Sequence, residues 1–186
     1  MSSILIVYGT AHGHTTRIVD RIAGELKRRG FQVTRWRGDE LPAHVDPEDF
    51  DAFVIAGSVL LGRHQRYLRT FVRRHRNRLN QVPSAFVSVS GALMGDWEPG
   101  QEKARKYLER FLDRTGWHPS LARSFAGNLA YTRYGPVTRW VMKRISAHTG
   151  RPTHTRRDWE FTDWDAVDRL AAYFAARLPA PAVTVA

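Results

Sequence analysis

The sequence contains no cysteine. Disulfides, thiol catalysis and metal or iron–sulfur sites ligated by cysteine are therefore excluded, so any redox chemistry requires a bound cofactor. The chain also has no basic and apolar leader at its start and no apolar run that approaches a membrane span, and we expect a cytoplasmic location. Its 186 residues suffice for one substantial core. We predict one domain over residues 1–178 and a flexible tail over residues 179–186.

Acidic residues and lysine are scarce. The chain has 29 basic and 18 acidic residues, a net charge of +11, and its lysines are limited to Lys27, Lys103, Lys106 and Lys143. Such a positive field attracts nucleic acid, an acidic membrane surface or a substrate that carries carboxylates. A solvated surface in an arginine-rich proteome explains the same charge equally well. Composition alone does not decide between these interpretations.

Strand and helix patterns alternate along most of the chain. Apolar or β-prone runs predict strands at residues 4–8, 31–36, 52–56, 85–89 and 121–126. Between them, apolar residues recur at helical spacing in three groups. The first is Ile18, Val19, Ile22, Ala23 and Leu26, the second Leu68, Phe71, Val72 and Leu79, and the third Ala104, Tyr107, Leu108, Phe111 and Leu112. The run 52–56 has no polar alternation, which is typical of a parallel strand covered on both faces. The pattern predicts a doubly wound α/β fold.

The alternation is interrupted over about residues 130–157. This segment holds a short helical pattern of Val137, Trp140, Val141 and Ile145, followed by a polar stretch over residues 149–157. After it, Trp159 and Phe161 alternate as in a short strand, and a last helix follows with its apolar face inward. We therefore predict an insertion within one continuous domain.

The first loop has the composition of a phosphate-binding loop. It follows the apolar run 4–8 and precedes a helical pattern that starts near Thr15, so its amides and hydroxyls would meet an anion at the positive end of that helix. The loop lacks both Gly-x-Gly-x-x-Gly and a Gly-Lys-Thr ending, which favours a mononucleotide over a dinucleotide or ATP. His12 and His14 have no third ligand at a suitable spacing, and we predict no metal. The candidate cofactor-binding residues are Thr10, Ala11, His12, Gly13, His14 and Thr15.

Two further loops would reach the same edge of the sheet, because the carboxyl ends of parallel strands lie together. Both are rich in glycine and carry apolar side chains at their tips. A planar, largely apolar ring held between the two tips would explain this composition. Side chains that cap the sheet or pack against the insertion would explain it as well. The candidate residues are Ser58, Val59, Leu60, Leu61 and Gly62 in one loop, and Ser90, Gly91, Ala92, Leu93, Met94 and Trp97 in the other.

The three loops resemble those of the flavodoxins. The motif Thr10-x-His12-Gly13-x-Thr15 is similar to the flavodoxin phosphate loop, with His12 in place of a hydroxyl residue. The resemblance implies a five-stranded parallel sheet of order 2-1-3-4-5, a helical insertion near the fifth strand, and FMN as the cofactor.

The insertion narrows the resemblance. The patterns Tyr131-x-Arg133-Tyr134 and Arg139-Trp140-x-Met142-Lys143 look like those of the flavodoxin-type protoporphyrinogen IX oxidases, quinone-dependent enzymes of bacterial haem biosynthesis. This resemblance implies oxidation of protoporphyrinogen IX, with electrons passed from FMN to menaquinone or ubiquinone. It identifies no general acid or base.

We expect the insertion to serve as a platform for the substrate or the membrane. Its basic residues suit propionates or anionic lipid, and its aromatic residues suit a flat or interfacial surface. The basic amphipathic helix would place the protein at the inner face of the cell membrane, although an ordinary surface helix that seals the domain has the same pattern. The residues are Tyr131, Arg133, Tyr134, Arg139, Trp140 and Lys143.

Two other functions remain as alternatives. A flavodoxin-like electron carrier shares the loops, but such carriers are usually acidic, unlike this chain. A basic module that binds nucleic acid would leave the first loop unexplained and lacks aromatic residues interleaved on a basic strand, so we expect no nucleic-acid partner. The sequence leaves open whether the chain forms a homo-oligomer.

Overall fold

The fold is built on one parallel sheet. In the computed structural model, which describes residues 2–94, 98–129, 131–133, 135–148 and 153–179, five parallel strands lie in the order β2-β1-β3-β4-β5, as predicted. The strands are β1 (Ser3–Gly9), β2 (Gln32–Arg37), β3 (Ala52–Ser58), β4 (Ser84–Ser90) and β5 (Leu121–Ala126). Each lies within two residues of the range expected from its apolar run.

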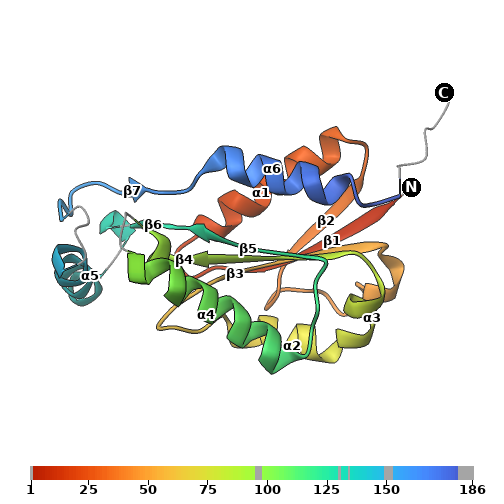
Figure 1. Ribbon diagram of the computed structural model, residues 1–186, viewed down its shortest axis with the longest axis horizontal. Helices are drawn as coiled ribbons and strands as arrows, with labels where there is room; N and C mark the ends of the chain where they lie inside the picture. The colour runs from red at the N-terminus through yellow and green to blue at the C-terminus, as the bar shows by residue number, and fades with distance from the viewer. Residues whose placement is uncertain (1, 95–97, 130, 134, 149–152, 180–186) are drawn as a thin grey trace.

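Helices cover both faces of the sheet (Figure 1). On one face lie α1 (His14–Arg28) and α6 (Trp164–Ala175), and on the other α2 (Arg66–Arg74), α3 (Arg76–Gln81) and α4 (Glu98–Thr115). The segment from Leu68 to Leu79 was expected to form one helix, but it forms two. At His75, between α2 and α3, φ is −106° and ψ is 17°, outside the helical region, and this break lets Leu79 point into the core.

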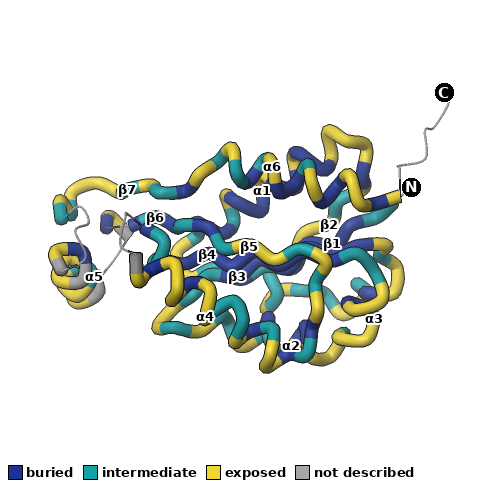
Figure 2. The backbone as a smooth tube through the Cα atoms, viewed as in Figure 1, coloured by how far each residue is buried: buried dark blue, intermediate teal, exposed yellow. Residues whose placement is uncertain are grey.

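The side chains of β1 alternate between two apolar cores. Ile4 and Ile6 pack with the buried faces of α1 and α6, whereas Leu5 and Val7 pack beneath α2 and α4. The central strands are buried along nearly their whole length, while exposed residues lie on the outer faces of the helices (Figure 2). A sheet covered in this way presents ligand-accessible backbone only at its ends, so the loops there determine the site.

The insertion forms a small unit at one end of the sheet. Its two strands, β6 (Asn128–Leu129) and β7 (Trp159–Glu160), pair antiparallel, and between them lie a short 3₁₀ helix (Tyr131–Arg133) and α5 (Pro136–His148). Met94, from the loop after β4, is buried with Leu129 and Tyr131 in a third apolar cluster. The insertion is therefore anchored to the end of the sheet from which the loops emerge.

The start of β1 and the end of α6 lie together at the opposite end of the molecule from α5 (Figure 1). The Ser2 hydroxyl donates a hydrogen bond to the Pro179 carbonyl oxygen at 3.2 Å. Among the described helices, none combines the length and apolar character needed to cross a bilayer.

Candidate functional site at the carboxyl edge of the sheet

The first loop is fixed at the end of β1 by hydrogen bonds to short side chains. Gly13 has a φ of 83°, a left-handed conformation that glycine adopts without strain, and it starts α1. Its N–H donates to Thr10 Oγ1 at 2.9 Å, and the Ala11 N–H donates to Ser58 Oγ at 3.1 Å. Gln65 Nε2 donates to the same Ser58 oxygen at 2.6 Å. The loop after β1 is thereby joined to the end of β3.

The start of α1 offers donors that suit a phosphate. No side chain caps this helix and its first turn carries no acidic residue, so its first N–H groups are available to an anion. The Thr15 hydroxyl, in the first turn, is buried without a hydrogen-bond partner among the described residues. A buried hydroxyl of this kind is a site where a ligand oxygen would restore a bond. The residues present therefore fit the phosphate of a flavin mononucleotide, with His12 exposed beside them.

His14 has a structural contact that the sequence does not reveal. Its side chain is buried, its Nε2 lies 2.6 Å from Thr162 Oγ1, and its ring packs against Trp164. Burial lowers the pKa of His14, and the Glu160 carboxylate, 3.8 Å away, opposes this effect. The imidazole thus joins α1 to the segment after β7 through Nε2, while its Nδ1 is buried without a hydrogen-bond partner among the described residues. The backbone N–H and Nδ1 are the groups left for the predicted role in cofactor binding.

The second loop is a tight hairpin with an apolar tip. Leu60 and Arg63 exchange backbone hydrogen bonds of 2.9 and 3.1 Å, and the two residues between them, Leu61 and Gly62, have φ values of 49° and 76°. Two successive positive φ values are typical of the turn that closes a two-residue hairpin. Leu60 is 50% exposed and Leu61 is 94% exposed. Two leucines in solvent at the sheet edge are available to cover an apolar ring.

The third loop divides between the site edge and the insertion. After β4 the chain makes a 3₁₀ turn over Gly91–Leu93, which is held by a hydrogen bond from the Ala92 N–H to Ser90 Oγ at 3.1 Å. These residues are half-buried at the edge. Met94, in contrast, is buried in the cluster of the insertion, so its side chain packs there rather than lining an open crevice. Trp97 lies outside the described residues.

A polar pocket of about 140 Å³ opens between the first loop and the insertion. Gly13 and Arg17 form one wall, and Asn128, Asp158 and the β7 residues Trp159 and Glu160 form the other. Arg17 is paired with Glu160 at 2.9 Å across the pocket. Sequence reasoning missed this pocket, because its walls are more than a hundred residues apart in the chain and only the folded insertion brings them together.

The residues predicted to form the platform differ in their exposure to solvent. Trp140 is 60% exposed, and Lys143 is also exposed. Tyr131 differs from the expected surface residue, because it is fully buried and its hydroxyl lies 2.8 Å from Ser146 Oγ. Arg139 is half-buried and donates from Nε to the Tyr131 carbonyl oxygen at 2.9 Å. Tyr134 and the side chain of Arg133 lie outside the described residues.

The outer face of α5 is apolar. Val137 is 75% exposed and Val141 is 39% exposed, and together with Trp140 they form a stripe one helical turn long. The guanidinium of Arg144 lies 5.4 Å from the centre of the Trp140 ring. The stripe therefore has the cationic Arg144 at its edge, as expected for a helix that lies between water and an apolar phase.

Comparisons with known proteins agree with this arrangement. The family model of the flavodoxin domain matches residues 5–156. The protoporphyrinogen IX dehydrogenase [quinone] of Escherichia coli K12 is 34% identical over 173 residues, which cover 92% of this chain and 93% of that protein. The protein of the same name from Leishmania major is 34% identical over 180 residues, with coverage of 92% and 74%.

Among solved structures, oxidised flavodoxin 1 from Bacillus cereus aligns with a TM-score of 0.59 at 13% identity, covering 96% of this chain and all of the other. That identity supports the fold alone, whereas the family model extends across the three loops and most of the insertion. The chain belongs to the flavodoxin family, on the branch that contains the quinone-dependent protoporphyrinogen IX dehydrogenases.

Proposed function

We propose that this chain binds FMN and oxidises protoporphyrinogen IX to protoporphyrin IX, with a membrane quinone as the electron acceptor. The observation that carries the proposal is the 34% identity to the Escherichia coli dehydrogenase across 92% of the chain, because a match over so much of the chain includes the insertion. The unpartnered Thr15 hydroxyl and the uncapped start of α1 support the flavin phosphate.

The chemistry that FMN supplies when bound is electron transfer in pairs, and three rounds remove the six electrons that separate the porphyrinogen from the porphyrin. The contribution of the chain is to bind and orient. The first loop would hold the phosphate through its amides and the Thr15 hydroxyl. The exposed Leu60 and Leu61 would cover one side of the ring system and exclude water there.

The insertion would bring the site to the lipid in which a quinone is dissolved. We propose that the apolar stripe of α5, formed by Val137, Trp140 and Val141, inserts into the anionic inner face of the cell membrane. Lys143, exposed on the same helix, would contact lipid phosphates or a substrate propionate. Arg139 would support this face from within, since its Nε is fixed by the Tyr131 carbonyl oxygen.

The test is an anaerobic turnover assay. Protoporphyrinogen IX and a soluble quinone analogue are added to the FMN-loaded protein, and porphyrin fluorescence is followed. We expect porphyrin to form continuously with the quinone present. Without the quinone, formation should stop at about one third of a porphyrin per flavin, because each flavin accepts one electron pair.

Two controls make the result decisive. The same mixture without protein measures spontaneous oxidation, and a flavin reductase added with its nicotinamide substrate shows that the flavin is redox-active. Flavin that the reductase reduces and the quinone analogue reoxidises, but that yields no porphyrin above the spontaneous rate, would contradict the proposal and favour an electron carrier.

A further inference from the structure

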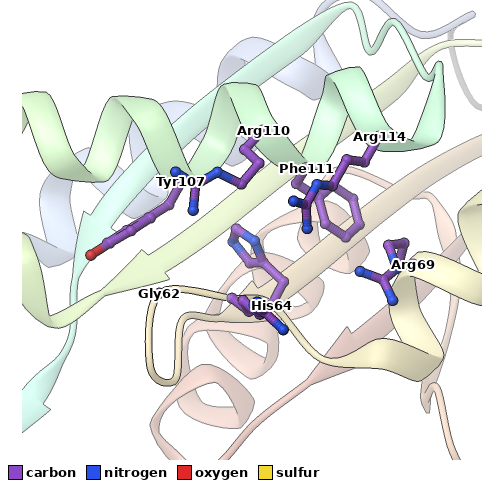
Figure 3. Close-up of a pocket in the computed structure, with 8 residues that line it drawn as sticks. Gly62, His64, Arg69, Tyr107, Arg110, Phe111 and Arg114 are labelled. Atoms are coloured by element: carbon purple, nitrogen blue, oxygen red, sulfur yellow. The ribbon is translucent and has the colours of Figure 1, made fainter.

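A pocket lined by arginines lies on the face of the sheet covered by α2 and α4 (Figure 3). A pocket of about 20 Å³ opens there between the hairpin after β3, the first turn of α2 and the middle of α4. Four arginines line it, which are Arg63 from the hairpin, Arg69 from α2, and Arg110 and Arg114 from α4. The two α4 residues lie one turn apart, so both side chains reach the same opening.

The arginines of this pocket have no carboxylate partner among the residues that the structure describes. Elsewhere on the same helix the situation is different, because Arg105 is paired with Glu102 at 2.8 Å and with Glu109 at 2.6 Å. Where α4 carries nearby glutamates, its arginine thus forms ion pairs with them. Four guanidinium groups around one small opening repel each other, and this arrangement is stabilised when an anion enters.

The floor of the pocket is apolar and carries no charge at neutral pH. His64 packs edge-on against Phe111, with ring centres 5.0 Å apart, and its Nε2 lies 2.9 Å from Ser88 Oγ. Burial lowers the pKa of His64 to about 4, so the imidazole is neutral. A floor of this kind limits solvation of the opening and strengthens the interaction of the arginines with a bound anion.

We propose that this pocket binds the phosphate group of a phosphate-bearing ligand. A phosphate or diphosphate suits four unneutralised arginines better than a single carboxylate, because it carries more charge and more oxygens for guanidinium groups to bind in pairs. A volume of about 20 Å³ holds little more than one water molecule, so the arginines would bind phosphate oxygens at the mouth of the pocket and the remainder of the ligand stays outside. The source is either a soluble phosphate ester or the head group of an anionic phospholipid. The inference stands independently of the function proposed above.

Occupation of this site would act on the hairpin. Tyr107 packs on the turn, with its Cε1 3.4 Å from the position that a Cβ on Gly62 would take, and Arg63 belongs to the hairpin itself. A phosphate held jointly by Arg63 and the α4 arginines would link the hairpin to α4. The exposed Leu60 and Leu61 would be held in place as a consequence.

The test measures binding of pyrophosphate to the FMN-loaded protein by titration calorimetry, with saturating FMN present so that the first loop is filled. The variant Arg110→Gln/Arg114→Gln removes two exposed arginines of the pocket. The matched control Arg73→Gln/Arg76→Gln removes two exposed arginines that do not line it. Thermal unfolding verifies that all three proteins are folded.

We expect the pocket variant to bind pyrophosphate at least about tenfold more weakly, since each lost bond to a charged group is worth about a factor of ten. The control should stay within about twofold of the wild type. Equal weakening of pyrophosphate binding in both variants would show attraction by diffuse surface charge and overturn the proposal. Absence of pyrophosphate binding to the wild type would also overturn it, unless the vesicle experiment described next detects binding to a lipid phosphate.

The second arm identifies the source. Flotation with phosphatidylcholine vesicles, with and without phosphatidic acid, is carried out on the same three proteins. Retention that requires phosphatidic acid and is lost only in the Arg110→Gln/Arg114→Gln variant assigns the site to a lipid head group. Pyrophosphate binding without such retention assigns it to a soluble phosphate ester. Failure of both arms would exclude the site.

Discussion

The largely buried His64 should make the protein lose stability in mild acid. Burial lowers its pKa to about 4 from the ordinary value of 6.5. Between these two values the unfolded chain binds a proton that the native protein excludes. The contribution of His64 is therefore complete above the ordinary value and decreases as the pH falls toward 4. From these pKa values, acidification from about pH 7.5 to about pH 5 lowers the free energy of unfolding by about 2 kcal/mol through this residue.

The assay compares urea unfolding of the wild type and of His64→Gln at those two pH values. In the native protein the imidazole Nε2 of His64 lies 2.9 Å from Ser88 Oγ. Glutamine places an amide near that oxygen, but the amide does not titrate. Acid should therefore destabilise the variant by about 2 kcal/mol less than the wild type. Taking the difference between the two proteins removes the contributions of His14 and His75, whose pKa values burial also lowers.

The control for packing is Phe111→Leu, which disturbs the ring contact with His64 and introduces no titrating group. It should lower stability at both pH values and leave the effect of acid near that of the wild type. If His64→Gln and the wild type lose the same free energy on acidification, His64 is not held neutral by burial, and the floor beneath the arginines is not kept free of charge by it.

Three further predictions concern the site and the insertion. Gly13→Leu should lose FMN, because Gly13 has a positive φ that leucine adopts only with strain. Gly24→Leu, a matched change on α1 at a glycine without a positive φ where an added Cβ meets no atom within 4 Å, should stay yellow. Visible absorbance after gel filtration measures this, and a yellow Gly13→Leu protein would refute the loop assignment. Trp140→Ala should weaken partition to anionic vesicles about tenfold, because it removes an exposed aromatic side chain from α5. Tyr173→Ala removes an exposed aromatic side chain from α6 and should leave partition unchanged. Equal partition of the two variants would exclude α5 as the membrane contact. Thr162→Val should lower the free energy of unfolding by about 1–3 kcal/mol, because it leaves a buried imidazole nitrogen without its hydrogen bond; unchanged urea unfolding would contradict this.

The sheet could be predicted from the sequence because its signal is local. A buried parallel strand such as β3 contains a continuous apolar run, here residues 52–56, and the helices carry their apolar positions at regular spacing. The break at His75 was missed for the same reason. It depends on how Leu79 meets the core rather than on a breaker residue, since the segment contains no glycine or proline before Pro83.

The site could be predicted only in part. The first loop was found because glycine and threonine between an apolar run and a helical pattern are typical of a phosphate-binding loop. The other two were found because apolar side chains at the tips of glycine-rich loops are unusual. Tyr131 and Met94 were expected near a ligand but are buried in the cluster of the insertion, since an aromatic or thioether side chain has the same sequence signal in a core as on a platform. The contact of His14 with Thr162 joins residues far apart in the chain and leaves no local trace.

The bond between Ser2 and Pro179 closes the chain on itself at the end remote from the loops. A peptide that bridges these two positions would cover a short gap, so new termini could be opened elsewhere on the surface without disturbing the sheet. Attachment to an electrode through this end would direct the loops and α5 toward the solution or toward a supported lipid film. Electron exchange with a dissolved quinone could then be recorded as current on an oriented layer of the protein.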